Sequence, residues 1–169
     1  MQEHELQILE VDEQKIISKL EELGAEMVFN GDMNSLYYSL DSPEKFLRLR
    51  KKGDKTFLTL KIKKNQHPIT ISEEHEIELN DFETAKKMIE HLGLKEFSRD
   101  FRKRKSFKTN LGIVEINSYE TIPTFIELEA DSSEKLIALV NLIGFKMKDT
   151  KSWSGKEIID YYKNKENLL

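Results

Sequence analysis

Several segments of this chain alternate charged and aliphatic residues, and within each segment the charges have one sign. Arg48 and Arg50 are separated by a leucine, and so are Glu127 and Glu129. A period of two is typical of a β-strand whose two faces differ chemically. Two like charges at positions i and i+2 lie roughly 6.5–7 Å apart on one face and repel each other unless a counter-charge lies nearby. The charged faces of these strands therefore need partners of opposite sign.

The same alternation recurs along the chain, with aliphatic residues between the charges. For any single strand, an open sheet with one face in water is the simpler interpretation. The whole set favours a sheet that closes into a barrel with its charged faces inward, because opposite charges then meet. The positions on the charged faces are Glu3, Glu5 and Gln7; Arg48 and Arg50; Thr59, Lys61 and Lys63; Glu74, Glu76 and Glu78; Arg102 and Arg104; Glu115 and Asn117; and Glu127 and Glu129.

Three segments between the strands change to the spacing of amphipathic helices. Each begins near a residue that favours an N-cap and ends at a glycine, which predicts helices over 12–24, 81–93 and 132–144. A further helical piece is expected over 155–163. The predicted class is α+β, with the helices covering the apolar outside of the barrel. The predicted strands cover 3–9, 36–40, 46–50, 56–63, 73–79, 98–108, 113–117 and 124–129, with a loop over 64–72.

Length and composition restrict the remaining possibilities. The chain has 169 residues and no cysteine, which excludes thiolate metal sites and cysteine nucleophiles. We expect a single domain over 1–169, with 150–169 as a C-terminal helical extension packed on it. Acidic residues at the start do not fit a signal peptide, and no apolar stretch is long enough to cross a bilayer. A cytoplasmic monomer or homodimer is expected.

A lumen with both signs of charge suits a highly charged anion bound together with divalent cations. Arginine and lysine bind phosphate oxygens, whereas Mg²⁺ takes carboxylate oxygens and bridges phosphate oxygens. Triphosphate is the anion that this combination predicts, because phosphoryl transfer depends on positioning and charge neutralisation. The basic residues expected to line the lumen are Arg48, Arg50, Lys61, Lys63, Arg102 and Arg104.

Other signals point away from common enzyme and nucleic-acid classes. The sequence has no Gly-rich phosphate loop, no Gly-x-Ser-x-Gly and no His-Glu-x-x-His. The four histidines share no metal-ligand spacing, so we expect structural or solvent-exposed roles for them. A basic run that includes Arg99, Lys103, Lys105 and Lys108 leaves nucleic acid as an alternative partner. The net charge of −4 and the poor interleaving with aromatic residues disfavour it.

Taken in order, these motifs resemble the CYTH, or triphosphate tunnel metalloenzyme, superfamily, which includes class IV adenylyl cyclases and thiamine triphosphatases. That family begins with a Glu-x-Glu-x-Lys strand and closes with a Glu-x-Glu strand. The resemblance implies an eight-stranded antiparallel β tunnel with a charged lumen and helices packed on the outside. The segments that carry it are Glu3–Gln7, Leu47–Arg50, Leu58–Lys61, Glu74–Glu78, Arg102–Arg104, Phe125–Glu129, and Ser152-Trp153 followed by Tyr161-Tyr162.

The resemblance also implies roles for individual residues. Carboxylates would hold Mg²⁺ or Mn²⁺, basic side chains would bind the triphosphate, and Glu76 or Glu78 would orient those cations or join the metal shell. The implied metal ligands are Glu3, Glu5, Glu76, Glu127 and Glu129; the implied substrate ligands are Arg48, Arg50, Lys61, Lys63, Arg102 and Arg104; and the implied catalytic set is Glu3, Glu5, Lys61 and Arg104.

Two positions depart from the family pattern. Gln7 stands where the first motif ends in lysine, and Asn117 stands where an aspartate is usual. Loss of one charge-assisted contact in a dry site lowers a rate by about 10²-fold or more. The predicted function is a metal-dependent triphosphate phosphohydrolase acting on tripolyphosphate, thiamine triphosphate or ATP. The alternatives are a class IV-type adenylyl cyclase, which makes cyclic AMP from ATP, and a catalytically impaired triphosphate- or nucleotide-binding protein.

Overall fold

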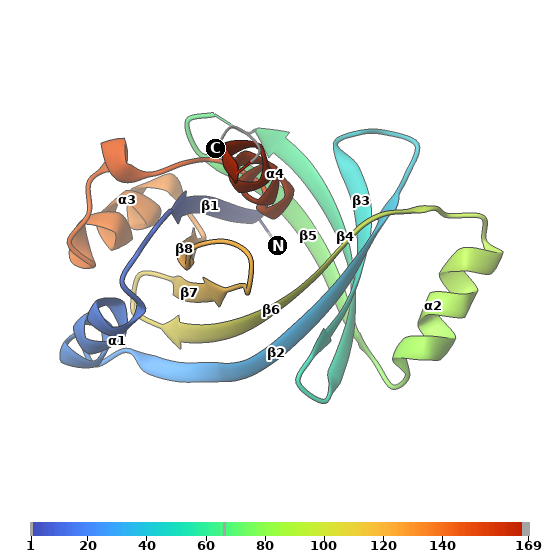
Figure 1. The fold of residues 1–169 in the computed structure, drawn as a ribbon, viewed down its shortest axis with the longest axis horizontal. Helices are drawn as coiled ribbons and strands as arrows, with labels where there is room; N and C mark the ends of the chain where they lie inside the picture. Colours follow the sequence, from blue (N-terminus) through green and yellow to red (C-terminus); the bar gives the residue numbers. More distant parts are fainter. Residues whose placement is uncertain (1, 66, 167–169) are drawn as a thin grey trace.

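Alternating sequence patterns become eight β-strands and four α-helices in a computed structural model of the chain, which describes residues 2–65 and 67–166. The strands form one closed antiparallel barrel in the order β1-β5-β4-β3-β2-β6-β7-β8 (Figure 1). This confirms the predicted α+β class and the eight-stranded barrel with helices outside. The strands are β1 (Gln2–Ile8), β2 (Glu26–Ser39), β3 (Lys45–Lys52), β4 (Lys55–Asn65), β5 (Thr70–Leu79), β6 (Glu96–Lys108), β7 (Ile113–Ser118) and β8 (Phe125–Ala130).

The first three helices begin at a side-chain N-cap that accepts hydrogen bonds from backbone N–H groups, as predicted. Each ends before a glycine with positive φ, so the predicted ranges were slightly too long because they included cap and glycine. A fourth helix, α4, covers Gly155–Glu166, and residues 167–169 of the expected C-terminal extension lie outside the described part of the chain. The capped helices are α1 (Glu13–Glu22) after Asp12, α2 (Phe82–His91) after Asp81, and α3 (Ser133–Leu142) after Ser132.

Two strand predictions were wrong in extent. The strand expected over 36–40 is only the end of β2, which begins at Glu26. The first half of β2 is mostly exposed and contains Asn30, Gly31 and Asp32, which have low strand propensity; pairing with β6 keeps it extended. The loop expected over 64–72 is shorter, because β4 runs to Asn65 and β5 begins at Thr70.

Each helix covers part of the apolar outer surface of the barrel. Helices α1 and α3 pack on β1, β7 and β8, whereas α2 packs on β2 and β3 at the opposite side (Figure 1). Helix α4 contributes Ile158 and Tyr162 to a third cluster with Phe125. None of the described helices is both long and apolar enough to span a bilayer. Because aliphatic residues face the helices, the alternate charged residues face inward.

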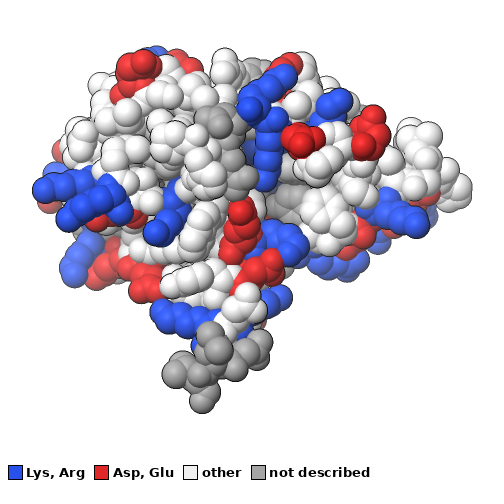
Figure 2. Space-filling model, turned by 90° about the horizontal axis from the view of Figure 1, so that it is seen from above, with Lys and Arg blue, Asp and Glu red and all other residues white. Residues whose placement is uncertain are grey.

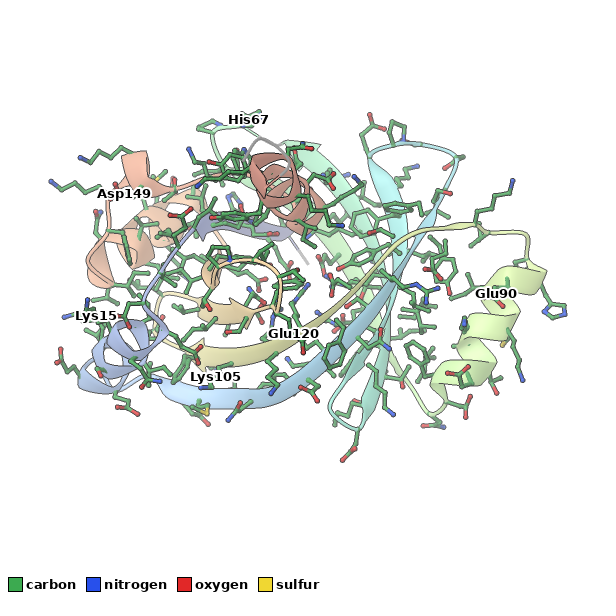
Figure 3. All side chains as sticks on the ribbon, in the orientation of Figure 1. Lys15, His67, Glu90, Lys105, Glu120 and Asp149 are labelled. Carbon is green, nitrogen blue, oxygen red and sulfur yellow. The ribbon has the colours of Figure 1, made fainter. Side chains whose placement is uncertain are left out.

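Charged side chains are spread over the face of the molecule that is seen from above (Figure 2). From above, acidic and basic side chains lie next to one another near the middle of the surface (Figure 2). Side chains from the strands project into the barrel along its length (Figure 3).

Candidate active site

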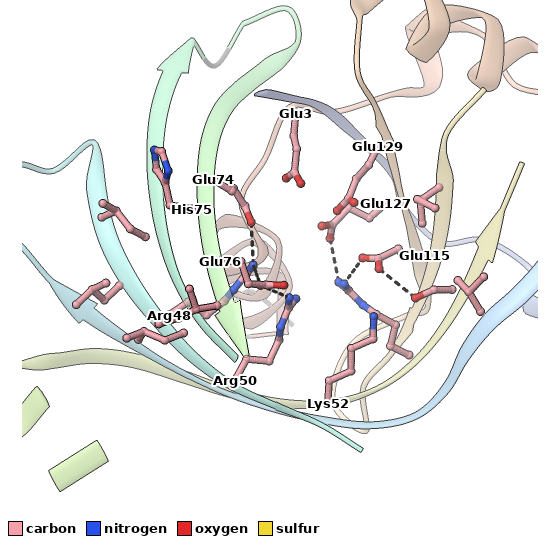
Figure 4. Close-up of a pocket in the computed structure, with 18 residues that line it drawn as sticks. Glu3, Arg48, Arg50, Lys52, Glu74, His75, Glu76, Glu115, Glu127 and Glu129 are labelled. Carbon is pink, nitrogen blue, oxygen red and sulfur yellow. Dashed lines mark hydrogen bonds and ion pairs between the residues drawn. The ribbon is translucent and has the colours of Figure 1, made fainter. Parts of the chain in front are cut away.

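Charged residues from both halves of the barrel surround an internal cavity of about 870 Å³. Figure 4 shows their side chains pointing toward one another from opposite walls. The charged residues that line this cavity are Glu3, Arg48, Arg50, Lys52, Glu74, Glu76, Arg104, Glu115, Glu127 and Glu129.

One wall, built by β1, β8 and β7, is acidic. The strand register places Glu5 opposite Glu129 and Glu115 opposite Glu127. Carboxylate oxygens of Glu115, Glu127 and Glu129 lie within 4.8 Å of one another. Carboxylates this close repel when all are ionised, so the cluster favours either protonation or a bound cation.

Three of the carboxylates on this wall, Glu3, Glu127 and Glu129, have raised pKa values, whereas burial raises the pKa of Glu115 but Arg104 and other nearby bases outweigh it and lower that pKa. Burial, and then the charge of Glu5, raises the pKa of Glu127 to about 7. Burial, and then the charge of Glu115, raises the pKa of Glu129 well above its usual range. Burial is also the main cause that raises the pKa of Glu3 to about 7. At these three carboxylates, the positive charge of neighbouring basic side chains is therefore too small to offset burial and the repulsion between acids.

The opposite wall, built by β3, β4 and β5, pairs its acids with bases. Arg48 Nη2 lies 3.1 Å from Glu74 Oε2, and Lys61 Nζ lies 2.7 Å from Glu74 Oε1. Burial raises the pKa of Glu74, but Arg48 and Lys61 outweigh it and lower the pKa to about 2. Arg50 Nη2 donates to Glu76 Oε2 at 2.8 Å. Here the acids orient the basic side chains.

Arg104 is a basic side chain that contacts acids of the acidic wall. Its Nη1 forms an ion pair with Glu115 Oε2, and its Nη2 lies 3.6 Å from Glu127 Oε2. Its Nε donates to Asn117 Oδ1 at 2.8 Å. Asn117 therefore orients Arg104 with an acceptor oxygen that an aspartate would also supply.

Three arginines retain unused donors. The Nε atoms of Arg48, Arg50 and Arg102 are buried and have no hydrogen-bond partner among the described residues. Arg102 uses Nη1 for Asp100, at 2.7 Å, and for the Tyr119 hydroxyl, at 2.9 Å. A buried N–H group without an acceptor is costly, and guanidinium groups bind phosphate oxygens with geometric precision. The arginine set therefore fits an anion with many oxygens.

A second pocket of about 400 Å³ adjoins the main cavity, since Arg48 and Glu127 line both. Its wall combines basic residues with aromatic rings. The residues of both kinds are Arg48, Lys61, Lys63, Arg99, Arg102, Lys156 and Lys163, with Tyr37, Phe46, Phe97, Phe125 and Trp153.

Each site residue predicted from the sequence lies in one of these two pockets, although its role stays a prediction. Glu78 is the exception among the acids considered, because it pairs with Lys55 at 3.0 Å in an exposed position. The predicted residues that line the main cavity are Glu3, Arg48, Arg50, Glu76, Arg104, Glu127 and Glu129. Those that line the second pocket are Glu5, Lys61, Lys63 and Arg102, together with Arg48 and Glu127.

The sequence analysis left three lining residues without a role. Glu74 and Glu115 were placed on charged faces, but only cross-strand register shows that Glu74 meets Lys61 and that Glu115 meets Glu127. Lys52 lies beyond the strand predicted over 46–50, although it is the last residue of β3. The continued alternation after Arg48 and Arg50 was the available signal for Lys52.

Residues of the basic run considered for nucleic acid interact with nearby acids, and so does His75. Arg99 pairs with Glu96, and Lys105 pairs with Glu13. These pairs neutralise part of the basic run considered for nucleic acid. The exposed ring of His75 interacts with Glu73, and His75 also lines the main cavity (Figure 4).

The acidic wall fits a divalent cation. Mg²⁺ and Mn²⁺ prefer oxygen ligands, and the three clustered carboxylates on β7 and β8 supply them within the span that one ion needs. The raised pKa values of Glu127 and Glu129 indicate unbalanced negative charge, which a divalent ion would neutralise.

The sequence matches the CYTH domain over residues 1–140. A search of curated proteins finds no match. A conserved hypothetical protein from Pyrococcus furiosus has a similar structure, with a TM-score of 0.81 and 26% identity over 92% of this chain and 99% of that one. A protein from Pyrococcus horikoshii gives a TM-score of 0.82 and 26% identity over 92% and 98%.

A more distant structure shares the fold. It is a Hippeastrum protein described as an adenylyl cyclase candidate with a dominant triphosphatase activity. Its TM-score is 0.59, with 15% identity over 92% of this chain and 91% of that one. The match to the domain covers most of the sequence, and the barrel and its charged lumen agree with it: the chain belongs to the CYTH family.

Proposed function

We propose that this protein binds a triphosphate compound together with Mg²⁺ or Mn²⁺ in the barrel lumen and hydrolyses it. One observation carries the proposal: buried arginine Nε donors without partners among the described residues, and a cluster of three carboxylates, line adjoining pockets. The donors fit phosphate oxygens, and the carboxylates fit the divalent ion that accompanies a triphosphate.

The basic residues would divide the work of binding. Arg48 and Arg50 are held by Glu74 and Glu76 through Nη2, which leaves their Nε atoms for phosphate oxygens. Arg104, oriented from the opposite side of the cavity, would contact another phosphate group. Such clamps position the reacting phosphorus and neutralise its charge before reaction.

The metal would be held by Glu115, Glu127 and Glu129, with Glu3 and Glu5 on the adjacent strand β1. When bound, the metal neutralises charge on phosphate oxygens and lowers the pKa of a coordinated water. Glu3, whose pKa is raised to about 7, has the affinity needed to hold a proton at its carboxylate near neutral pH.

The test is incubation of the purified chain with tripolyphosphate, thiamine triphosphate or ATP, with Mg²⁺, Mn²⁺ or EDTA. Metal-dependent release of phosphate supports the proposal. Glu129→Gln should lower the rate by about 100-fold. Glu78→Gln, which changes an exposed glutamate outside both pockets, is the matched control and should lower it less than about threefold. Tight binding without product would contradict hydrolysis.

A cyclase is the second candidate, and the aromatic wall of the second pocket favours it. Tyr37, Phe46 and Phe97 form a cluster with ring centroids 5.8–6.4 Å apart. Such rings suit a nucleoside beside the phosphate site. Cyclic AMP and pyrophosphate formed from ATP, in equal amounts, would identify this activity.

Gln7 favours a third candidate, a binding protein without turnover. The side-chain amide of Gln7 forms hydrogen bonds with Glu5 and with the Trp153 N–H, and it brings no positive charge to the lumen. Gln7→Lys separates the candidates, because a large increase in rate would identify an impaired enzyme. An unchanged rate in an already active protein would show that the amide suffices.

A further inference from the structure

Gln7 links the tunnel interior to the C-terminal segment. Gln7 Nε2 donates to Glu5 Oε1 at 2.7 Å, and Gln7 Oε1 accepts from the backbone N–H of Trp153 at 2.9 Å. The side chain is buried, with 1% of its surface exposed. Both ends of one buried amide are therefore engaged, each with a different part of the molecule.

Glu5 passes this link on into the phosphate site. Its other carboxylate oxygen, Oε2, lies 3.0 Å from Lys61 Nζ. Lys61 in turn lies 2.7 Å from Glu74. A continuous series of hydrogen bonds and ion pairs thus runs from Trp153 through Gln7 to the paired acids of the opposite wall.

The C-terminal segment is attached to the barrel at a few defined points. The backbones of Gln7 and Lys151 exchange two hydrogen bonds of 2.8 Å. Further along, the Tyr162 hydroxyl donates to Glu10 at 3.0 Å, and Ile158 packs in the adjacent core. Helix α4 consequently lies beside β1 (Figure 1).

This segment forms one wall of the second pocket. Trp153, Lys156, Ile159 and Lys163 all line it. A shift of the segment changes the shape and charge of that pocket. Whatever holds Trp153 in place therefore also sets the geometry of the second pocket.

We propose that Gln7 is a positioning residue that couples ligand binding at Glu5 and Lys61, which line the second pocket beside the main cavity, to the seating of the segment 151–166 over the second pocket. The inference rests on the proposed function only for the identity of the ligand. A metal–phosphate ligand that engages Glu5 or Lys61 alters the bond to Gln7 Nε2. Gln7 Oε1 transmits the change to the Trp153 N–H. By linkage, seating of the segment alters ligand affinity by the same factor.

Glutamine is specifically suited to this role because it offers a donor and an acceptor at once. Lysine has donors only, so a lysine at position 7 would hold Glu5 and leave the Trp153 N–H without its acceptor. At position 7, glutamine therefore lacks the positive charge of the family lysine but connects Glu5 to the Trp153 N–H.

Hydrogen exchange of the ligand-free, full-length chain tests the link itself. We compare the wild type with Gln7→Met, which removes both bonds, and with Gln7→Lys, which removes only the acceptor. The Trp153 amide should exchange about fivefold faster or more in both variants, as expected for loss of one buried hydrogen bond. Tyr162→Phe is the control, since it loosens the far end of α4 and should leave the Trp153 amide unchanged. Unchanged exchange in both Gln7 variants would overturn the proposal.

Fluorescence tests the coupling. Trp153 is the only tryptophan of the chain, so its emission reports on the segment. We expect MgCl₂, alone and with inorganic tripolyphosphate, to shift the emission of the wild type. In Gln7→Met, calorimetry should still detect binding, while the emission change falls at least about fivefold. A full emission response in Gln7→Met, or wild-type binding without any response, would overturn the coupling.

The outcomes separate the two proposals. Release of phosphate with unchanged Trp153 exchange and emission in the Gln7 variants would leave the hydrolase and remove the coupling. A coupled emission response without product would keep the coupling and remove hydrolysis. If neither probe binds the wild type, both are overturned.

Discussion

Glutamates on two strands of the same barrel behave in opposite ways. On β5, neighbouring bases lower the pKa of Glu74 to about 2 against the effect of burial. On β8, burial and the charge of Glu5 raise the pKa of Glu127 to about 7. Both residues are glutamates at alternating positions facing one lumen. The difference lies in their neighbours.

Strand order explains the contrast. Acidic β5 lies beside β4, and the register places Glu74 opposite Lys61. Acidic β8 lies between β1 and β7, and the register places Glu129 opposite Glu5 and Glu127 opposite Glu115. The acids of β5 are therefore paired with basic side chains of the protein, whereas those of β8 lie beside other acids; under the proposed function the former organise phosphate-binding cations and the latter bind a divalent cation.

Exchange of single acids for amides should show the largest difference. Glu129→Gln removes a proposed metal ligand and should weaken Mg²⁺ binding by at least about 100-fold, because even partners outside the ligand set cost 10–100-fold. Glu74→Gln removes an acid already neutralised by Arg48 and Lys61, so Mg²⁺ affinity should change less than about tenfold. Calorimetry with MgCl₂ measures both. Equal losses in the two variants would contradict the division between the walls.

Removal of a base from the paired wall should destabilise the fold. Lys61→Met removes the ammonium group that lies 3.0 Å from the buried Glu5 and 2.7 Å from the half-buried Glu74. Breaking a buried pair costs about 3–5 kcal/mol. Lys64→Met, on the same strand, breaks an exposed pair with Glu73 and should cost less than about 1 kcal/mol. Urea unfolding at pH 7 compares them, and similar costs would show that the inner pairs are no stronger than the surface pair.

The sequence predicts those features of the fold and site that depend on residues near one another along the chain. Alternation and like-charge repetition predicted the inward faces, and N-cap and glycine signals predicted α1 to α3, because each depends on neighbours along the chain. The long first half of β2 was missed, since its polar residues are held by pairing with β6 rather than by their own propensity.

Register was the part that the sequence could not supply. No local pattern shows that Glu115 lies opposite Glu127, or that Gln7 reaches Trp153, 146 positions later. Gly112 lies between the strands predicted over 98–108 and 113–117. A Cβ at Gly112 would lie 2.1 Å from the carbonyl oxygen of Glu129, so the close approach of β7 and β8 at the acidic wall requires glycine there.

The two walls should also respond oppositely to pH. Glu3 and Glu127 have pKa values raised to about 7 from 4.5, so the metal-free protein binds more protons than its unfolded chain between these values. Its free energy of unfolding should therefore fall as pH rises from about 5 to 8. Glu74, with a pKa of about 2, contributes stability that is lost only as pH falls below 4.5.

Thermal unfolding with and without MgCl₂ checks this sign. Mg²⁺ should raise the melting temperature more at pH 8 than at pH 5.5, because the β8 acids must lose protons to bind it. Glu127→Gln should flatten the fall in stability toward pH 8, whereas Glu74→Gln should not. A metal-free protein whose stability rises steadily from pH 5 to 8 would contradict the raised pKa values.

The smallest effect is expected at Asn117, which lies between the walls. Its Oδ1 accepts from Arg104 and its Nδ2 donates to the backbone oxygen of Glu115, so neither end is directed to the acid cluster. Asn117→Asp keeps the acceptor and should change Mg²⁺ affinity less than about threefold. Asn117→Ala removes one bond to Arg104 and should weaken tripolyphosphate binding by about fivefold, with Mg²⁺ affinity unchanged. Calorimetry with each ligand distinguishes these outcomes. A tenfold gain of Mg²⁺ affinity in Asn117→Asp would instead assign this position to the acidic wall, because only a carboxylate that reaches the ion strengthens its binding to that extent.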